Sequence, residues 1–282
     1  MSTGRVRRLR DRGEAAQARL EDARTRHASI DLGLSLWEGD SSIGGGLLAG
    51  ALAYRLFVLL LPTALFLVSG LGLYADATHK STRQVTQEAG LHGLFASNVA
   101  ATASGRGRWI VFLVSIPVIL YAAAKLYRAL AVVHAIVWHG TGRAGRTTPR
   151  GVGLLLAVLG VTVVATELVG WIRRHDQFGG LSALLVYAVL VGGAWVVLSL
   201  QLPHADASWR WLLPGSLLFG VGLLGVNVFN VYVTARLVDN QANTYGALGI
   251  ATALLLSLVL VGRVAVISAE VNALLFRHHA QV

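Results

Sequence analysis

The hydrophobic positions of this chain form long uninterrupted stretches rather than short alternating ones. Runs such as VFLVSIPVIL and ATALLLSLVLVG place apolar side chains on every side of a helix. A helix that crosses the hydrocarbon core of a bilayer, about 30 Å thick, needs about 20 such residues, and its backbone groups must bond within the segment. The pattern therefore predicts six transmembrane helices, at Leu47–Tyr74, Trp109–Val133, Gly151–Trp171, Leu181–Leu202, Trp211–Val233 and Gly246–Glu270.

These stretches define the fold class and divide the chain into three parts. We expect an all-α, polytopic membrane helix bundle with an amphipathic cytoplasmic helix at its N-terminus. The parts are a basic arm at residues 1–40, a transmembrane domain at 41–275 with a long extracytoplasmic loop at 75–108, and a cytoplasmic tail at 276–282. The composition agrees, because 55% of the 282 residues are hydrophobic and 13% are charged. Soluble proteins carry about 25% charged residues, so an ordinary soluble enzyme is excluded.

The distribution of basic residues predicts the orientation in the membrane. The chain has 24 Lys and Arg against 14 Asp and Glu. If the N-terminus lies inside, roughly twice as many basic residues fall on the inner side as on the outer side, and basic residues favour the cytoplasmic side of membrane proteins. We therefore expect both termini in the cytoplasm. Residues 1–40 lack the apolar core of a cleavable signal peptide, so the first span is expected to act as an uncleaved anchor.

The basic arm has the pattern of an amphipathic helix. In RVRRLRDRGEAAQARLEDARTR, Val6, Leu9, Ala16, Leu20 and Ala23 lie near one face, with arginines and acids around the rest. Such a helix beside a membrane span binds anionic lipid of the inner leaflet. A solvated basic tail that only satisfies the charge rule is an equally good interpretation. Nucleic acid is not an expected partner, because no aromatic stacking platform accompanies the charge.

Five charged side chains lie within the predicted spans, toward their cytoplasmic ends. Charges inside membrane helices are costly and are by default candidates for function. We hypothesise that they converge on an inner vestibule that binds an anionic or lipid group such as a phosphate or carboxylate, for which arginine is well suited. The alternative is snorkelling, in which long stems only carry the charges to the headgroups. The five are Arg55, Lys125, Arg128, Arg263 and Glu270.

A second polar group lies in the outer half of the spans. It consists of Glu167 in the third span and of Asn227 and Asn230 in the fifth. Polar side chains of this kind hydrogen-bond between membrane helices. We favour this role over that of an outer gate.

Several familiar motifs have a structural explanation here. Gly220, Gly222 and Gly225 match G-x-G-x-x-G but lie inside an apolar span, where glycines let a neighbouring helix approach closely. Gly46 and Gly50 at the start of the first span receive the same interpretation. With no cysteine, no clustered histidine ligands and no hydrolase or phosphate-loop motif, we expect no enzyme activity, no catalytic residue, no metal and no other cofactor.

Two segments carry a family resemblance. LLAGALAYRLFVLLLPTALFL (47–67) and YGALGIATALLLSLVLVGRVAVISAEVNALL (245–275) resemble the first and last spans of the YihY/BrkB family of bacterial inner-membrane proteins, some labelled ribonuclease BN. Arg55 departs from the family pattern, in which an aromatic or polar residue is common. The resemblance implies a multi-pass protein of the bacterial plasma membrane, with roles in lipid or envelope-precursor transport suggested for relatives. Residues that match the family pattern, without an assigned role, are Tyr54, Pro62, Tyr245, Gly246, Gly249, Glu270 and Asn272.

Two functions follow as expectations. The first is transport, or transport-associated handling, of an anionic amphiphile or envelope lipid. The second is a non-transporting membrane scaffold or envelope-integrity factor that docks a partner through the basic arm. Membrane lipids are the expected partners in both, and the sequence names neither a protein partner nor an oligomeric state.

Overall fold

The structure is a computed structural model that describes residues 28–78, 107–143, 145–175, 179–230 and 247–280. It consists of two compact units, residues 1–46 and residues 47–282. The first unit contains α2 (Ala28–Ile43), which ends at Gly44 with a left-handed backbone φ of 67°. The arginine-rich segment that predicts an amphipathic helix lies outside the described residues.

The described residues are all-helical and contain no strand, as predicted. Six of the helices are long and apolar enough to cross a membrane, so the chain has the architecture of a multi-pass membrane protein. The predicted span ends Val233 and Gly246 lie outside the described residues. The six helices are α3 (Gly45–Ala77), α6 (Arg108–His139), α7 (Pro149–His175), α8 (Gly179–Ser199), α9 (Trp209–Phe229) and α11 (Ala247–Ala280).

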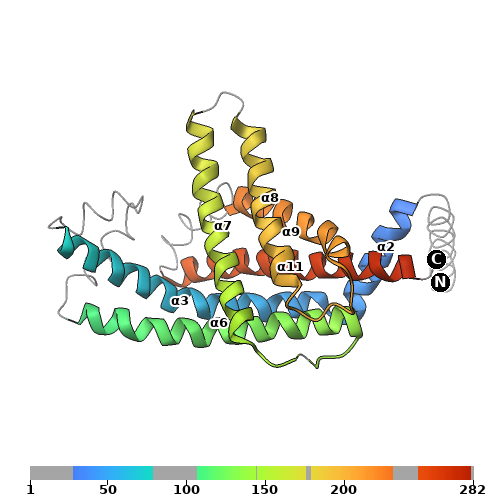
Figure 1. Ribbon diagram of the computed structural model, residues 1–282, viewed down its shortest axis with the longest axis horizontal. Coiled ribbons are helices and arrows are strands. Elements are labelled where there is room, and N and C mark those ends of the chain that lie inside the picture. The colour runs from blue at the N-terminus through green and yellow to red at the C-terminus, as the bar shows by residue number, and fades with distance from the viewer. Residues whose placement is uncertain (1–27, 79–106, 144, 176–178, 231–246, 281–282) are drawn as a thin grey trace, which may run out of the picture. The chain divides into compact units, whose positions relative to one another are not determined.

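Helices α7, α8, α9 and α11 pack against one another in chain order, and α6 contacts both α7 and α11. In Figure 1, α7 and α8 run side by side as an antiparallel pair that crosses α6. Half of the most apolar window of α8 is buried inside the protein, against 22% of that of α3. Helix α8 is therefore a central helix, and α3 presents most of its surface to the surroundings.

The glycines of the apparent dinucleotide motif serve helix packing. A Cβ atom on Gly220 would lie 2.6 Å from the carbonyl oxygen of Ala188 in α8, and one on Gly222 would lie 2.6 Å from the side chain of Val264 in α11. A Cβ on Gly225 would meet nothing within 4 Å in the part of the chain that the structure describes. The packing interpretation is therefore confirmed for the first two glycines, which let α9 approach a different neighbour on each side.

For Gly46 and Gly50 the same interpretation finds no neighbour among the described residues, since a Cβ on either would meet nothing there within 4 Å. The small residue that brings the first span close to the last one is Gly262 of α11. A Cβ there would lie 2.5 Å from the carbonyl oxygen of Ala49 in α3. The sequence pattern marked small residues on the first span, but a close approach depends on which face of a helix meets its neighbour.

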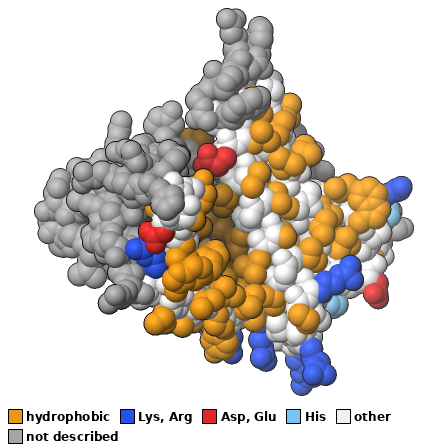
Figure 2. All heavy atoms as spheres, turned by 60° about the vertical axis from the view of Figure 1, so that its left-hand side comes forward, with side chains coloured by type: hydrophobic (Ala, Val, Ile, Leu, Met, Phe, Trp, Pro, Cys, Tyr) orange, Lys and Arg blue, Asp and Glu red, His pale blue; other side chains and the backbone are white. Residues whose placement is uncertain are grey.

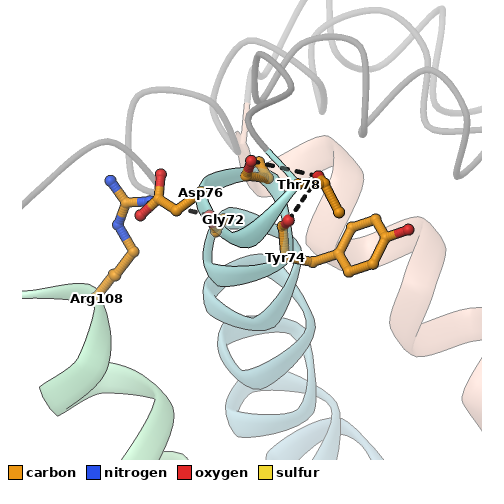
Figure 3. A network of polar contacts seen from close by, with 6 residues as sticks. Gly72, Tyr74, Asp76, Thr78 and Arg108 are labelled. Carbon is orange, nitrogen blue, oxygen red and sulfur yellow. Dashed lines mark hydrogen bonds and ion pairs between the residues drawn. The ribbon is translucent and has the colours of Figure 1, made fainter.

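The end of α3 is joined to the start of α6 by an ion pair. Arg108 donates a hydrogen bond to Asp76 at 2.6 Å and another to the carbonyl oxygen of Gly72 at 3.0 Å (Figure 3). Further along the same two helices, the rings of Phe66 and Phe112 stack with centroids 4.7 Å apart. These contacts hold the two helices together at the ends that flank the long loop.

The surface of the described residues is mostly apolar. In the view of Figure 2, hydrophobic side chains cover much of this surface, and the few charged side chains lie mostly near its edges. Large hydrophobic side chains such as Leu113, Val163 and Leu185 are exposed on three different helices. A surface of this kind suits a lipid environment, in agreement with the length of the helices.

Candidate functional site

The candidate site is built where α6 ends. Helix α6 has 32 residues and is about 48 Å long, which exceeds the thickness of the hydrocarbon core. It ends at Gly140, whose left-handed φ of 65° lets its N–H donate to the carbonyl oxygen of Ile136 at 2.9 Å. The following segment then leads back to α7, where Thr148 accepts a hydrogen bond from the Gly151 N–H at 3.1 Å and Pro149 occupies the first helical position.

Tyr127 marks the level at which α7 begins and α8 ends. Its hydroxyl donates to the carbonyl oxygen of Gln201 at 3.0 Å, just after α8, and its ring lies directly against Gly151 in the first turn of α7. Helix α6 continues past this level to His139, about 18 Å further at about 1.5 Å per residue. Arg128, the next residue, therefore lies level with helix ends rather than midway between them.

A polar cavity of about 430 Å³ lies at this level, on the side predicted to be cytoplasmic. Its walls come from α6 and from the α6–α7 and α8–α9 connections. Side chains that ionise or hydrogen-bond line it, and they are Tyr127, His139, Arg146, Gln201, His204 and Asp206.

A second polar cavity, of about 360 Å³, shares Gly145 and Arg146 with the first. Arg128 and Thr147 complete its walls. Both arginines are exposed to solvent. Arg146 therefore lines two cavities, with histidines in one and a second arginine in the other.

A tight turn forms one edge of the first cavity. Ala205 and Asp206 have φ angles of 46° and 57°, and the N–H of Ala207 donates to the carbonyl oxygen of His204 at 2.9 Å. Alanine has no local hydrogen bond to offset the cost of a left-handed conformation, which is about 1–2 kcal/mol. His204 is oriented by a 2.6 Å contact from its Nδ1 to the carbonyl oxygen of Leu202. Because a carbonyl only accepts, Nδ1 carries a hydrogen there.

A third cavity, of about 230 Å³, is apolar and is lined by all six long helices. Among the described residues of its lining, Thr162 alone has a hydroxyl, which donates to the carbonyl oxygen of Val158 at 2.9 Å. On α6, Leu126 and Leu130 face this cavity, whereas the next residue after each, Tyr127 and Ala131, faces the polar one. Helix α6 is therefore a shared wall between an apolar and a polar cavity.

A set of buried hydrogen bonds fixes the helices beside the apolar cavity. The indole N–H of Trp195, which lines the cavity, donates to Ser268 of α11 at 2.9 Å. Its ring stacks on Phe219 of α9 with centroids 3.8 Å apart. Asn272 accepts from the Gly215 N–H at 2.7 Å and donates to the carbonyl oxygen of Leu212 at 3.2 Å.

The described structure places the five predicted vestibule residues in different surroundings. Arg55 is exposed, with its guanidinium 5.8 Å from the Tyr54 ring centre. Lys125 is half-buried, 5.0 Å from the centre of the Tyr121 ring. Arg263 is half-buried and Glu270 is buried, with 6% of its surface exposed. Of the five, Arg128 lines one of the three described cavities, so a vestibule that contains all five stays a prediction.

The three residues of the outer polar group lie in different environments. Asn230 accepts a hydrogen bond from Ser257 of α11 at 2.6 Å, which fits the proposed role of joining helices. Asn227 is half-buried, and Glu167 is exposed on α7.

The residues of the family pattern also differ in their environment. Pro62 is buried within α3, Tyr54 is 59% exposed, and Asn272 joins α11 to α9. Gly249 lies in the first turn of α11, and Tyr245 and Gly246 lie outside the described residues.

Sequence reasoning missed most of the residues that line the polar cavities. Arg146 was not singled out as a candidate, and the histidines were considered only as metal ligands. Among the described residues, no group of three His, Asp or Glu could hold a metal ion. Arg146 could have been found from its position, because it lies in a short connection between two predicted spans. Such a connection lies at one surface of the membrane.

The comparisons with known proteins agree with the two end motifs. The model of the family described as virulence factor BrkB matches residues 40–281. No curated protein and no solved structure matches the chain significantly. The family resemblance of the first and last spans is thereby confirmed, and the chain belongs to the BrkB family of virulence factors.

Proposed function

We propose that this protein transports an anionic amphiphile or envelope lipid, or assists in its transport, across the bacterial plasma membrane. In this proposal both termini lie in the cytoplasm, and the polar cavities open to the cytoplasmic side. The observation that carries it is the shared wall of α6, with an apolar cavity on one side and a polar cavity that contains Arg146 on the other. An amphiphile has an apolar part and a polar headgroup, so it needs an apolar and a polar environment within the length of one molecule.

The size and lining of the apolar cavity support an aliphatic ligand. Its volume of about 230 Å³ exceeds that of a cavity of about 150 Å³ in another protein that stays dry and binds benzene. Its one hydroxyl already donates to the backbone, so a water molecule there would find few partners. Part of an acyl chain would make apolar contacts with every wall.

The proposal is tested by filling the apolar cavity in purified protein reconstituted into liposomes. Ala265 lines the cavity and is buried, so A265L places a larger apolar side chain in its space. We expect movement of a fluorescent phosphatidylglycerol between leaflets to slow at least fivefold, with no loss of thermal stability. V163L changes an exposed position on α7 and serves as the control. Equal rates in folded A265L and V163L would contradict the proposal.

A second proposal is a membrane scaffold that docks a partner or inner-leaflet lipid through its arm. It is supported by the division of the chain at Gly46 into a small first unit and a separate second one. Deletion of residues 1–40 distinguishes the two functions in cells. A scaffold should lose its function on deletion, whereas a transporter should keep measurable lipid movement.

A further inference from the structure

The two polar cavities that meet at Arg146 have the character of an anion site. Arg146 lines both, Arg128 lines one, and His139 and His204 line the other. Asp206 is the one acidic residue among the described residues that line them. Basic side chains therefore outnumber acidic ones around a space that a small molecule can enter.

We propose that this site binds a phosphate group and that Arg146 is its central ligand. This inference deepens the proposed function and rests on it, because the bound group is then the headgroup of the anionic amphiphile. The second arginine, Arg128, contacts the same phosphate from the neighbouring cavity.

The arrangement favours phosphate over carboxylate. Arg146 lines both cavities, with Arg128 in the lining of one and His139 and His204 in the lining of the other. A phosphate presents oxygens in tetrahedral directions, whereas the two oxygens of a carboxylate lie in one plane. An arginine forms paired hydrogen bonds to two phosphate oxygens and leaves the others for further donors.

Asp206 provides an internal check on this assignment. Its carboxylate lines the same cavity as Arg146 and repels an anion there. The strained turn at Ala205 and Asp206 holds this acid at the edge of the cavity. Removing its charge should therefore strengthen phosphate binding, whereas it should weaken the binding of a cation.

The experiment measures lipid retention by native mass spectrometry on the full-length protein in detergent. Phosphatidic acid is the phosphate probe, oleate the carboxylate probe, and phosphatidylcholine the zwitterionic one. Free sn-glycerol 3-phosphate is the competitor. We expect phosphatidic acid to bind at least tenfold more tightly than oleate or phosphatidylcholine. Displacement by equimolar glycerol 3-phosphate would assign the site to a free phosphate ester, and resistance to displacement would assign it to a lipid headgroup.

Variants test the individual residues. R146Q should weaken phosphatidic acid binding about tenfold, R128Q should weaken it less, and R146K should restore part of it because lysine keeps the charge without the planar fork. D206N should strengthen it about twofold or more. R143Q is the matched control, since Arg143 is exposed on the same connection and lines neither cavity.

Equal losses in R146Q and R143Q, or equal retention of oleate and phosphatidic acid, would overturn the inference. The binding measurement involves no movement of lipid, so it is independent of the transport assay. If phosphatidic acid binds through Arg146 but lipid movement is absent, the inference stands and transport is overturned. If lipid moves but R146Q binds phosphatidic acid normally, transport stands and the inference is overturned.

Discussion

The contacts among α8, α9 and α11 differ in kind from those around the polar cavities. In the first region, glycines bring helix backbones into direct contact, as where a Cβ on Gly192 would lie 2.9 Å from the carbonyl oxygen of Ser216. In the second region, long polar side chains from α6 and two connections surround open space, and Arg128 and Arg146 are exposed. At glycines such as Gly192 the first region leaves no room for an added methyl group, and the second region leaves room for a ligand.

This difference indicates that the two regions of the second unit have different roles. A close-packed interior transmits any change of volume to its neighbours, so the α8–α9–α11 region serves as a frame of fixed geometry. Exposed arginines can change rotamer at little cost, so the polar cavities can adapt to a headgroup. Mutations should therefore lower stability in the first region and change binding in the second.

The largest loss of stability is expected at Gly215. A Cβ at this position would lie directly against the carbonyl oxygen of Ser268 and 2.6 Å from Asn272. G215A should therefore push α9 away from α11, at a cost of about 3 kcal/mol. That cost corresponds to a fall in melting temperature of roughly 6 °C or more, measured in detergent by fluorescence. G225A is the control and should melt like the wild type, because its Cβ has open space.

A smaller loss is expected from removing the side-chain bridge between the same helices. N272L deprives the buried Gly215 N–H and the Leu212 carbonyl oxygen of their partner. Leaving buried polar groups unsatisfied costs about 1–3 kcal/mol, and the melting temperature should fall by roughly 2–6 °C. N227L, at a half-buried asparagine of α9, should have the smaller effect. If both variants melt at the same temperature, the bridge contributes nothing specific.

The smallest effect is expected at the ion pair between α3 and α6. Asp76 is 63% exposed, and pairs of this kind contribute about 0–1 kcal/mol. D76N should lower the melting temperature by at most about 2 °C at low salt, and 1 M NaCl should reduce the difference because it screens the pair. R108Q should cost more than D76N, because Arg108 also donates to Gly72. A large fall in the melting temperature of D76N would mean that this contact stabilises the protein as strongly as those of the α8–α9–α11 region.

Part of the candidate site was accessible from the sequence. Arg128 was marked as a charge near the cytoplasmic end of its span, and it does line a polar cavity. Asn272 was marked through the family pattern alone, without the hydrogen bonds that explain it. Arg146 and His204 come from two connections far apart in the chain, His139 is the last residue of α6, and no periodicity links the three. Their meeting depends on how α6, α7 and α8 pack.

The sequence by itself determined that the chain folds into long apolar helices and belongs to a membrane protein family. It could do so because lipid imposes a length and a composition on each helix separately. The tertiary structure alone decided which charges line a cavity, since a charge on a helix can face lipid, a neighbour or open space. It also decided that Gly215, Gly220 and Gly262, rather than Gly46 and Gly50, allow close contact, because helix rotation about its own axis is set by the neighbours.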